Sequence, residues 1–373
     1  MAGLYFHIPF CRRACVYCDF HFSTALDGRE RVLAAMRTEL ERRKAEWDTS
    51  PVDNLYFGGG TPSLLAPEEI KGLLDEVHRH GEVAATAEIT LEANPDDVTP
   101  AALEAWLALG ITRISLGTQS FRDERLRWMG RAHDAAQALR SIDLIAKAGF
   151  TSWTIDLIYG LPGMTLAEWD EQLTIALEHG MPHLSAYCLT VEPRTALHHQ
   201  VQKGRVLPAD DAQQAEQFEH LVRRMGGAGL VQYEISNFGR PGHFAQHNTS
   251  YWKGAPYMGI GPSAHSFDGK VRRWNVANNL RYAQGVEHNG THWEHEVLTT
   301  AQRANEMLLT GLRTMWGVDT ALLGLELPAE SRAEAERYVA EGLLQWRDTH
   351  LVLTARGKNF ADRIASDLFI LEP

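Results

Sequence analysis

Positive charge is scarce in this sequence, and that scarcity excludes one class of partner. Lysine and arginine number 36 against 48 aspartates and glutamates, which gives a formal net charge of −12. Binding to nucleic acid or to an anionic membrane surface depends on clustered basic side chains. The composition therefore predicts no nucleic-acid partner, and any anionic ligand must be held by a local site.

Long apolar runs are also missing. A membrane-spanning helix needs about 20 consecutive apolar residues, and no stretch of the sequence approaches that length. The first ten residues carry neither a basic start nor a small-residue cleavage site, so they do not read as a signal peptide. We expect a cytoplasmic protein without an integral membrane segment.

Cysteine is rare, and its distribution is uneven. Of the four cysteines, Cys11, Cys15 and Cys18 are crowded into one short segment, and Cys188 stands alone. Such a set is a poor disulfide framework but a good metal-ligand cluster in a reducing compartment. Cys188 is interpreted as a small core residue.

Short β-rich runs alternate with helical stretches through the first part of the chain, which is typical of a parallel sheet. Their strand ends are rich in glycine and polar residues, as expected for an α/β fold with a partial (β/α)6 TIM-like barrel that binds ligands at the carboxyl ends of its strands. The six runs are 4–8, 55–57, 89–92, 113–116, 154–158 and 184–189.

Three regions follow from this pattern. Residues 1–236 are predicted to form the partial barrel, and residues 237–290 a loop-rich segment. Residues 291–373 are predicted to form a small C-terminal α+β module, because helical stretches near 299–313 and 330–342 precede a short hairpin and a final helix. This order resembles a winged helix, yet no basic recognition face accompanies it.

The three clustered cysteines have C-x3-C-x2-C spacing directly after the first predicted strand. Three thiolates can hold three irons of a [4Fe–4S] cluster, which leaves the fourth iron open to a ligand that is not a protein side chain. Zinc is the alternative, with His7 or His21 as a fourth ligand, since structural zinc normally takes four protein ligands.

This motif after a first strand resembles the signature of radical S-adenosylmethionine (SAM) proteins, and the resemblance covers nearly the whole chain. In that family the methionine part of SAM chelates the open iron, and an electron from the cluster can cleave the sulfonium. The resemblance implies a cofactor site, for which the matching positions are Tyr5, Tyr17, Gly59, Gly60, Thr61, Glu92, Gln119, Arg131 and Asp156.

Each of these matches has an ordinary structural alternative. The glycines could form only a tight turn after the second strand, and Glu92 could pair with a surface base. Arg131 and Asp156 suit the carboxylate and ribose of the cofactor, but they could also form a buried ion pair with a structural role.

Four segments narrow the resemblance to the oxygen-independent coproporphyrinogen III oxidase branch. They are 5–11, 56–63, 115–121 and 156–163. Two features depart from the oxidases, which carry a fourth cysteine where this chain has Phe20 and an N-terminal extension that is absent before Cys11. Neither departure fits decarboxylation of a porphyrinogen.

A further motif, H-N-x-x-Y-W at residues 247–252, is similar to the signature of the HemW family of heme chaperones. His247 is a candidate axial ligand of heme iron, and Tyr251 and Trp252 could cover an edge of the macrocycle. A loop histidine beside two packing aromatic residues is the structural alternative. His265 is a second candidate ligand, and Arg272 and Arg273 could meet the heme propionates.

The sequence therefore predicts a heme chaperone with three ligands: a [4Fe–4S] cluster, SAM and heme. Its expected partner is a heme-acceptor protein, with transient contact with membrane heme proteins, and we expect a monomer or a dimer. The rivals are the coproporphyrinogen oxidase, a radical SAM heme-modifying enzyme, and an iron–sulfur scaffold that binds neither heme nor SAM.

Overall fold

The main sheet is organised around six parallel strands that follow one another in sequence order. The computed structural model describes residues 3–46 and 51–371. The strands are β1 (Gly3–Ile8), β2 (Val52–Gly59), β3 (Val83–Ala93), β4 (Arg113–Gln119), β5 (Ser152–Tyr159) and β6 (His183–Cys188). Each overlaps one of the predicted runs, and the predicted parallel sheet is confirmed.

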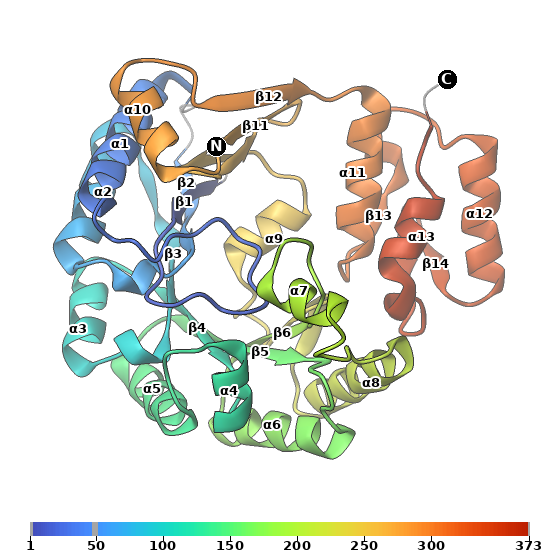
Figure 1. Ribbon diagram of the computed structural model, residues 1–373. Helices are drawn as coiled ribbons and strands as arrows, with labels where there is room; N and C mark the ends of the chain where they lie inside the picture. The colour runs from blue at the N-terminus through green and yellow to red at the C-terminus, as the bar shows by residue number, and fades with distance from the viewer. Residues whose placement is uncertain (1–2, 47–50, 372–373) are drawn as a thin grey trace.

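Helices connect these strands and surround the sheet (Figure 1). Thr99, Asp134 and Thr165 cap three of them by accepting a backbone N–H bond, which satisfies a donor that the first turn leaves free. The helices are α1 (Arg29–Arg42), α2 (Pro67–His80), α3 (Pro100–Ala108), α4 (Asp123–Met129), α5 (Ala135–Ala148), α6 (Leu166–Glu178), α7 (Ala196–Gln202) and α8 (Asp211–Gly227).

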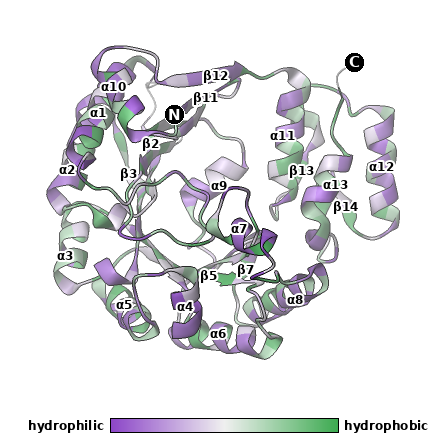
Figure 2. Ribbon diagram, viewed as in Figure 1, coloured by the Kyte–Doolittle hydropathy of each residue, from purple (hydrophilic) through white to green (hydrophobic). Residues whose placement is uncertain are grey.

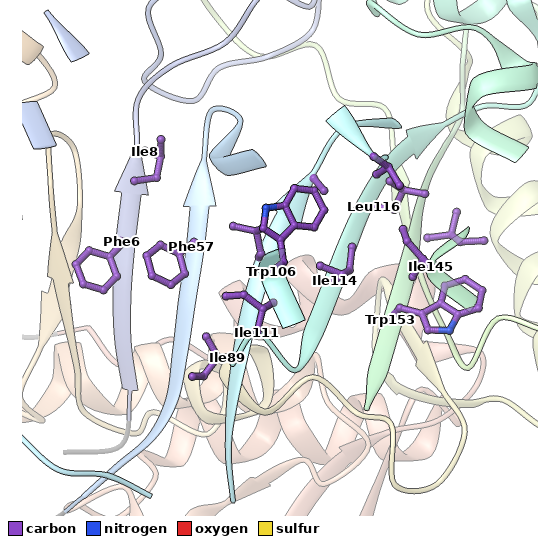
Figure 3. Close-up of a cluster of buried hydrophobic side chains, with 14 of the residues drawn as sticks. Phe6, Ile8, Phe57, Ile89, Trp106, Ile111, Ile114, Leu116, Ile145 and Trp153 are labelled. Atoms are coloured by element: carbon purple, nitrogen blue, oxygen red, sulfur yellow. The ribbon is translucent and has the colours of Figure 1, made fainter. Parts of the chain in front are cut away.

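The hydrophobic core lies between the outer face of the sheet and these helices. Phe6, Phe57 and Ile114 are fully buried there, and Trp106 of α3 belongs to the same cluster (Figure 3). Figure 2 shows that the helices carry both hydrophobic and hydrophilic residues, as expected where one side packs and the other meets water. Because side chains alternate along a strand, the other face of the sheet lines the interior of the part-barrel.

Residues 237–290, which the sequence predicts to be loop-rich, extend the sheet. Strands β9 (Tyr257–Ile260), β10 (His265–Phe267) and β11 (Val271–Asn275) continue it beyond β1, with β12 (Trp293–Val297) outermost. On the opposite side, β8 (Asn237–Gly239) pairs with β6, and β7 (Val231–Glu234) pairs with β8. These strands are three to five residues long, so their sequence periodicity is too short to predict them.

Two short helices complete this region: α9 (Gln246–Trp252) and α10 (Asn279–Glu287). Helix α9 contacts β2 and lies inside the ring of strands and helices in Figure 1. It therefore brings the H-N-x-x-Y-W motif to the interior of the part-barrel.

The C-terminal unit has its own hydrophobic cluster, formed by residues from 301 to 370. Its three strands, β13 (Val318–Asp319), β14 (Leu344–Arg347) and β15 (His350–Leu353), form an antiparallel sheet in the order β13-β15-β14. The helices are α11 (Thr300–Leu312), α12 (Ala329–Ala340) and α13 (Ala361–Asp367). Over the described ranges, no helix is long and apolar enough to cross a membrane.

Candidate functional site

A cavity of about 410 Å³ opens at the carboxyl ends of the parallel strands. Tyr187 on β6 lines this cavity, and 43% of the surface of Tyr187 is exposed there even though the residue lies among the strands and helices of the part-barrel. The interior of the part-barrel is therefore hollow. Most of the cofactor and cluster residues predicted from the sequence line this cavity: Cys11, Cys15, Tyr17, Cys18, Gly59, Gly60, Thr61, Glu92, Gln119, Arg131 and Asp156.

The cysteine loop follows β1 and is held by hydrogen bonds at several points. The Val16 N–H donates to Met129 O at the end of α4, at 3.0 Å, and the hydroxyl of Thr61 donates to Cys11 Sγ at 3.4 Å. Gly130 adopts φ +80°, and a Cβ there would approach Ala14 O to 2.9 Å, so the loop needs glycine at this contact.

All three cysteine sulfurs belong to residues that line the one cavity, which fits a cluster held by three protein ligands. Burial raises the pKa of Cys11, and burial raises that of Cys18 to about 12. The thiols of Cys11 and Cys18 therefore stay protonated near neutral pH, and iron must displace their protons. Within residues 3–46 and 51–371, no group of three or more His, Cys, Asp and Glu side chains is arranged to hold a single metal ion.

The side chain of Arg131 lines the cavity and contacts three neighbouring residues. Its Nη1 donates to Cys15 Sγ at 3.5 Å, and its Nη2 donates to Asn94 Oδ1 at 2.6 Å and to Gly117 O at 2.8 Å. Its Nε is buried without a hydrogen-bond partner among the described residues. That N–H is closed off from the cavity as well as unpaired, so a ligand carboxylate would be met by the guanidinium as a lining charge of the cavity.

Arg131 and Asp156 do not form the buried ion pair that was the structural alternative, since no salt bridge joins them in the described part of the chain. Asp156 instead accepts from Ser115 Oγ at 3.3 Å. Burial raises the pKa of Asp156 to about 6, while hydrogen bonds from Ser185 and Ser115 oppose the rise.

Glu92 ends β3 with its carboxylate at the cavity. It accepts from Tyr56 Oη at 2.8 Å and from the Gly59 N–H at 3.2 Å. Gly59 has φ +106°, a conformation that glycine adopts without strain. Burial raises the pKa of Glu92 to about 7, partly offset by the Tyr56 hydrogen bond and reinforced by the charge of Asp156.

Two predicted cofactor residues have unexpected positions or conformations. Gln119 has φ +66° at the end of β4, an uncommon conformation for a residue other than glycine that is often found at functional sites. Tyr5 does not line the cavity; its ring stacks on Tyr56 and His247, with centroids at 6.0 Å and 5.9 Å. The structure thus places Tyr5 beside the heme motif.

His247 lies in the interior of the part-barrel, at the start of α9. Its Nδ1 is 2.7 Å from Asn54 Oδ1, and its ring stacks on Tyr56 with centroids at 4.8 Å. The carboxylate of Glu88 accepts the Gln246 N–H at 2.8 Å and so anchors the first turn of α9. Burial lowers the pKa of His247 to about 4, so its imidazole is neutral at physiological pH.

Tyr251 and Trp252, the two aromatic residues of the motif, contact other residues than His247 does. The rings of Tyr251 and Trp252 meet edge to face at 5.2 Å, and Tyr251 is 42% exposed. The guanidinium of Arg313 lies 5.2 Å from the Trp252 ring. Among the described residues, no ring contact joins His247 to either aromatic side chain, although His247 and Tyr251 are four residues apart on one helix and so share a face.

The remaining heme candidates are engaged elsewhere. His265 stacks on Trp274, with centroids at 6.1 Å. Arg272 forms an ion pair with Glu306 at 2.9 Å, and Arg273 stacks on Trp293 at 4.2 Å. Each of the three side chains therefore has a protein neighbour, although Arg273 Nε is buried without a hydrogen-bond partner among the described residues.

Sequence reasoning missed several residues of this region. Asn94, Ser115, Gly117 and Tyr187 line the cavity, while Asn54 and Tyr56 contact His247. A signal existed for the last two: Asn54, Tyr56 and Gly58 alternate with buried Leu55 and Phe57, as expected of inward and outward positions on one strand.

The comparisons with known proteins agree with this architecture. Residues 5–174 match the family model described as the Radical SAM superfamily, and residues 298–360 match that of the HemN C-terminal domain. A part-barrel with three cysteines at its mouth, together with the first match, defines the class as a radical SAM protein.

Full-length relatives define the family. Heme chaperone HemW of Mycobacterium tuberculosis is 37% identical, covering 98% of this chain and 94% of the relative. Heme chaperone HemW of Bacillus subtilis is 32% identical, covering 98% of both chains. The chain belongs to the HemW family of heme chaperones.

A solved structure of coproporphyrinogen III oxidase (HemN) from Escherichia coli, described as a radical SAM enzyme, superposes with a TM-score of 0.86. It is 23% identical and covers 99% of this chain and 90% of that one. This likeness shows that the two proteins share a fold.

The pKa of Glu92 makes a testable prediction about SAM, which carries a sulfonium cation and an amino group with N–H donors. Only the ionised carboxylate attracts these groups, and Glu92 ionises near pH 7. We expect the affinity of the cluster-loaded protein for SAM to rise about tenfold between pH 6 and pH 8, measured by anaerobic calorimetry. Glu92→Gln should bind weakly and lose most of this slope.

The exposed Glu124 offers a matched control, because Glu124→Gln removes a carboxylate far less buried than Glu92. The Glu124→Gln variant should keep the wild-type pH profile. A wild-type affinity that does not change with pH would contradict the role of Glu92.

Proposed function

We propose that this protein binds heme and delivers it to an acceptor protein, and that a [4Fe–4S] cluster with bound SAM is part of the same barrel. The observation that carries the proposal is the position of His247. A neutral imidazole, held at Nδ1 by Asn54, lies inside the part-barrel on the motif helix. Neutral imidazole is the form that ligates heme iron.

The chain's own residues fit the cluster and SAM. Cys11, Cys15 and Cys18 would hold three irons, and the guanidinium of Arg131, which lines the same cavity, would pair with the carboxylate of SAM. Glu92 would accept from its ammonium or ribose. When bound, the cluster supplies an electron donor next to a cleavable sulfonium.

The cluster and SAM act in this proposal as a structural or redox element that controls heme transfer. Tyr56 links His247 to the cavity, because it stacks on His247 and donates to Glu92, which lines the cavity. Binding at the cofactor site can therefore affect His247 through the side chain of Tyr56.

The oxidase reaction is the second candidate, because the HemN fold matches over nearly the whole chain. Phe20 stands where the oxidases have their fourth cysteine, is 66% exposed, and lines the cavity. A phenylalanine side chain offers no thiol there, which weighs against the oxidase.

We further propose that the acceptor is a heme protein, met in part at the membrane surface, and that the carrier works in the cytoplasm. The described cysteines are all free, and a reducing compartment preserves free thiols.

Anaerobic reconstitution with iron and sulfide, followed by heme titration and a parallel assay with coproporphyrinogen III, tests the proposed function. We expect one heme per chain, transfer of that heme to an apo-hemoprotein, and no porphyrinogen product. Decarboxylated product with consumption of SAM would overturn the proposal in favour of the oxidase. Reductant-dependent loss of the heme absorption band would indicate a heme-modifying enzyme instead.

A further inference from the structure

One side of the His247 ring contacts a buried asparagine of β2, Asn54. Asn54 is on β2, one inward position before Tyr56, and is 1% exposed. Its Oδ1 lies 2.7 Å from His247 Nδ1. Asn54 is thus the hydrogen-bonding neighbour of the histidine on the strand that α9 contacts.

The backbone around Asn54 fixes where its side chain can lie. Asn54 is opposite Gly3 on β1, and a Cβ on Gly3 would approach Asn54 Oδ1 to 2.7 Å. On the other side, Asn54 is opposite Glu88, whose carboxylate anchors the first turn of α9. The amide and the helix that carries His247 are therefore held by neighbouring strands.

The atom of Asn54 that faces Nδ1 is the amide oxygen, which can only accept a hydrogen bond, so in this arrangement His247 Nδ1 is the donor. In a neutral imidazole, a protonated Nδ1 leaves the lone pair on Nε2. Residues that hold a ligand histidine through its second nitrogen set both its tautomer and its ring orientation.

The stacked rings restrain the same imidazole from another direction. His247 lies over Tyr56 at an interplanar angle of 29° and over Tyr5 at 23°. Stacking restricts the tilt of the imidazole plane, whereas the hydrogen bond to Asn54 selects the rotation within that plane. The two restraints together leave one orientation of the ring.

We propose that Asn54 is a positioning residue for heme binding: its amide oxygen holds His247 as the Nδ1–H tautomer and so presents Nε2 to the heme iron. Only the part of this inference that concerns heme binding rests on the proposed function. The tautomer of His247 is a property of the heme-free protein.

The first measurement is ¹⁵N NMR of histidine in the heme-free protein, with His247 assigned from the His247→Ala spectrum. We expect the Nδ1–H tautomer in the wild type and a mixture of tautomers in Asn54→Ala. Asn275→Ala is the matched control, because Asn275 is also a buried asparagine of the same sheet but bonds to Glu39 and Gly261. A wild-type His247 protonated at Nε2 would overturn the proposal.

The second measurement is heme binding. Asn54→Ala should weaken heme affinity about tenfold, as the loss of a partner behind a ligand histidine does, whereas Asn275→Ala should leave it unchanged. Asn54→Asp should restore binding and lower the midpoint potential of the bound heme, because a carboxylate makes the imidazole a stronger donor to iron. Equal losses of affinity in the Asn54→Ala and Asn275→Ala variants would refute the role of Asn54.

These two measurements separate failure of the inference from failure of the proposed function. If wild-type protein binds no heme while NMR shows the Nδ1–H tautomer, the heme proposal fails and the inference fails with it, although the Asn54 contact stands. If heme binds through His247 and the tautomer is independent of Asn54, the proposed function stands and only the inference is refuted.

Discussion

Replacing Cys15 with alanine should abolish the [4Fe–4S] cluster and leave the fold intact. Cys15 is one of the three cysteines that line the cavity, and Arg131 contacts it directly at 3.5 Å. We expect iron content to fall from about four atoms per chain to near zero after reconstitution. Circular dichroism should not change, because the hydrophobic core lies on the opposite face of the sheet.

Cys188→Ala is the matched control for this experiment. Cys188 also lines the cavity, at the end of β6, and burial raises the pKa of its thiol to about 11. Its loss should leave the cluster in place. If the Cys188→Ala variant lost the cluster while Cys15→Ala kept it, the assignment of the three ligands would be wrong.

The cluster-free Cys15→Ala variant also tests whether the cluster controls heme transfer. We expect it to bind heme and to transfer that heme more slowly than the wild type, measured by the absorbance of an apo-hemoprotein acceptor. Transfer at the wild-type rate would show that the cluster and SAM do not control heme transfer. The proposal that the protein carries heme would still stand.

Replacing His247 with alanine should produce the largest loss of heme binding. Removal of the axial ligand should weaken affinity roughly 100-fold, which corresponds to about 2.7 kcal/mol. The cavity lining does not include His247, so cluster content and SAM binding should remain. Heme titration followed by absorbance in the Soret region, with iron analysis on the same samples, measures both quantities.

Two further histidine variants serve as comparisons for the His247→Ala result. His288, the C-cap of α10, lies outside the site, so His288→Ala should match the wild type. His265→Ala removes the second candidate ligand and should change the spectrum of bound heme only if His265 completes the coordination. Unchanged affinity in His247→Ala would contradict the heme proposal.

The sequence predicts much of this architecture because its signals are local. Cys11, Cys15 and Cys18 are close in the chain, so their spacing alone indicates a shared metal centre. Strand-end residues such as Glu92 and Gln119 could be predicted to meet at one mouth, because parallel strands bring their carboxyl ends to one edge of a sheet. The C-terminal unit could be predicted for the same reason, since its helices and hairpin follow one another directly.

Other features depend on contacts between distant segments. Within residues 237–290, β9 joins the sheet where it meets β1, and β8 joins it where it meets β6, across more than 50 residues of sequence in each case. Tyr5 matches the cofactor positions by sequence, yet its ring lies against His247. Tyr56 carries no motif of its own and still contacts both Glu92 and His247.

From the sequence came the predictions of three cluster cysteines, a parallel sheet of six strands and a candidate histidine in the heme motif. Only the tertiary structure decided that His247 lies inside the part-barrel, bonded to Asn54 and stacked on two tyrosines. The physical reason is that hydrogen bonds and ring stacking act over a few ångströms in space. They therefore join residues 193 positions apart in the chain, a relation that residue spacing in a single sequence does not encode.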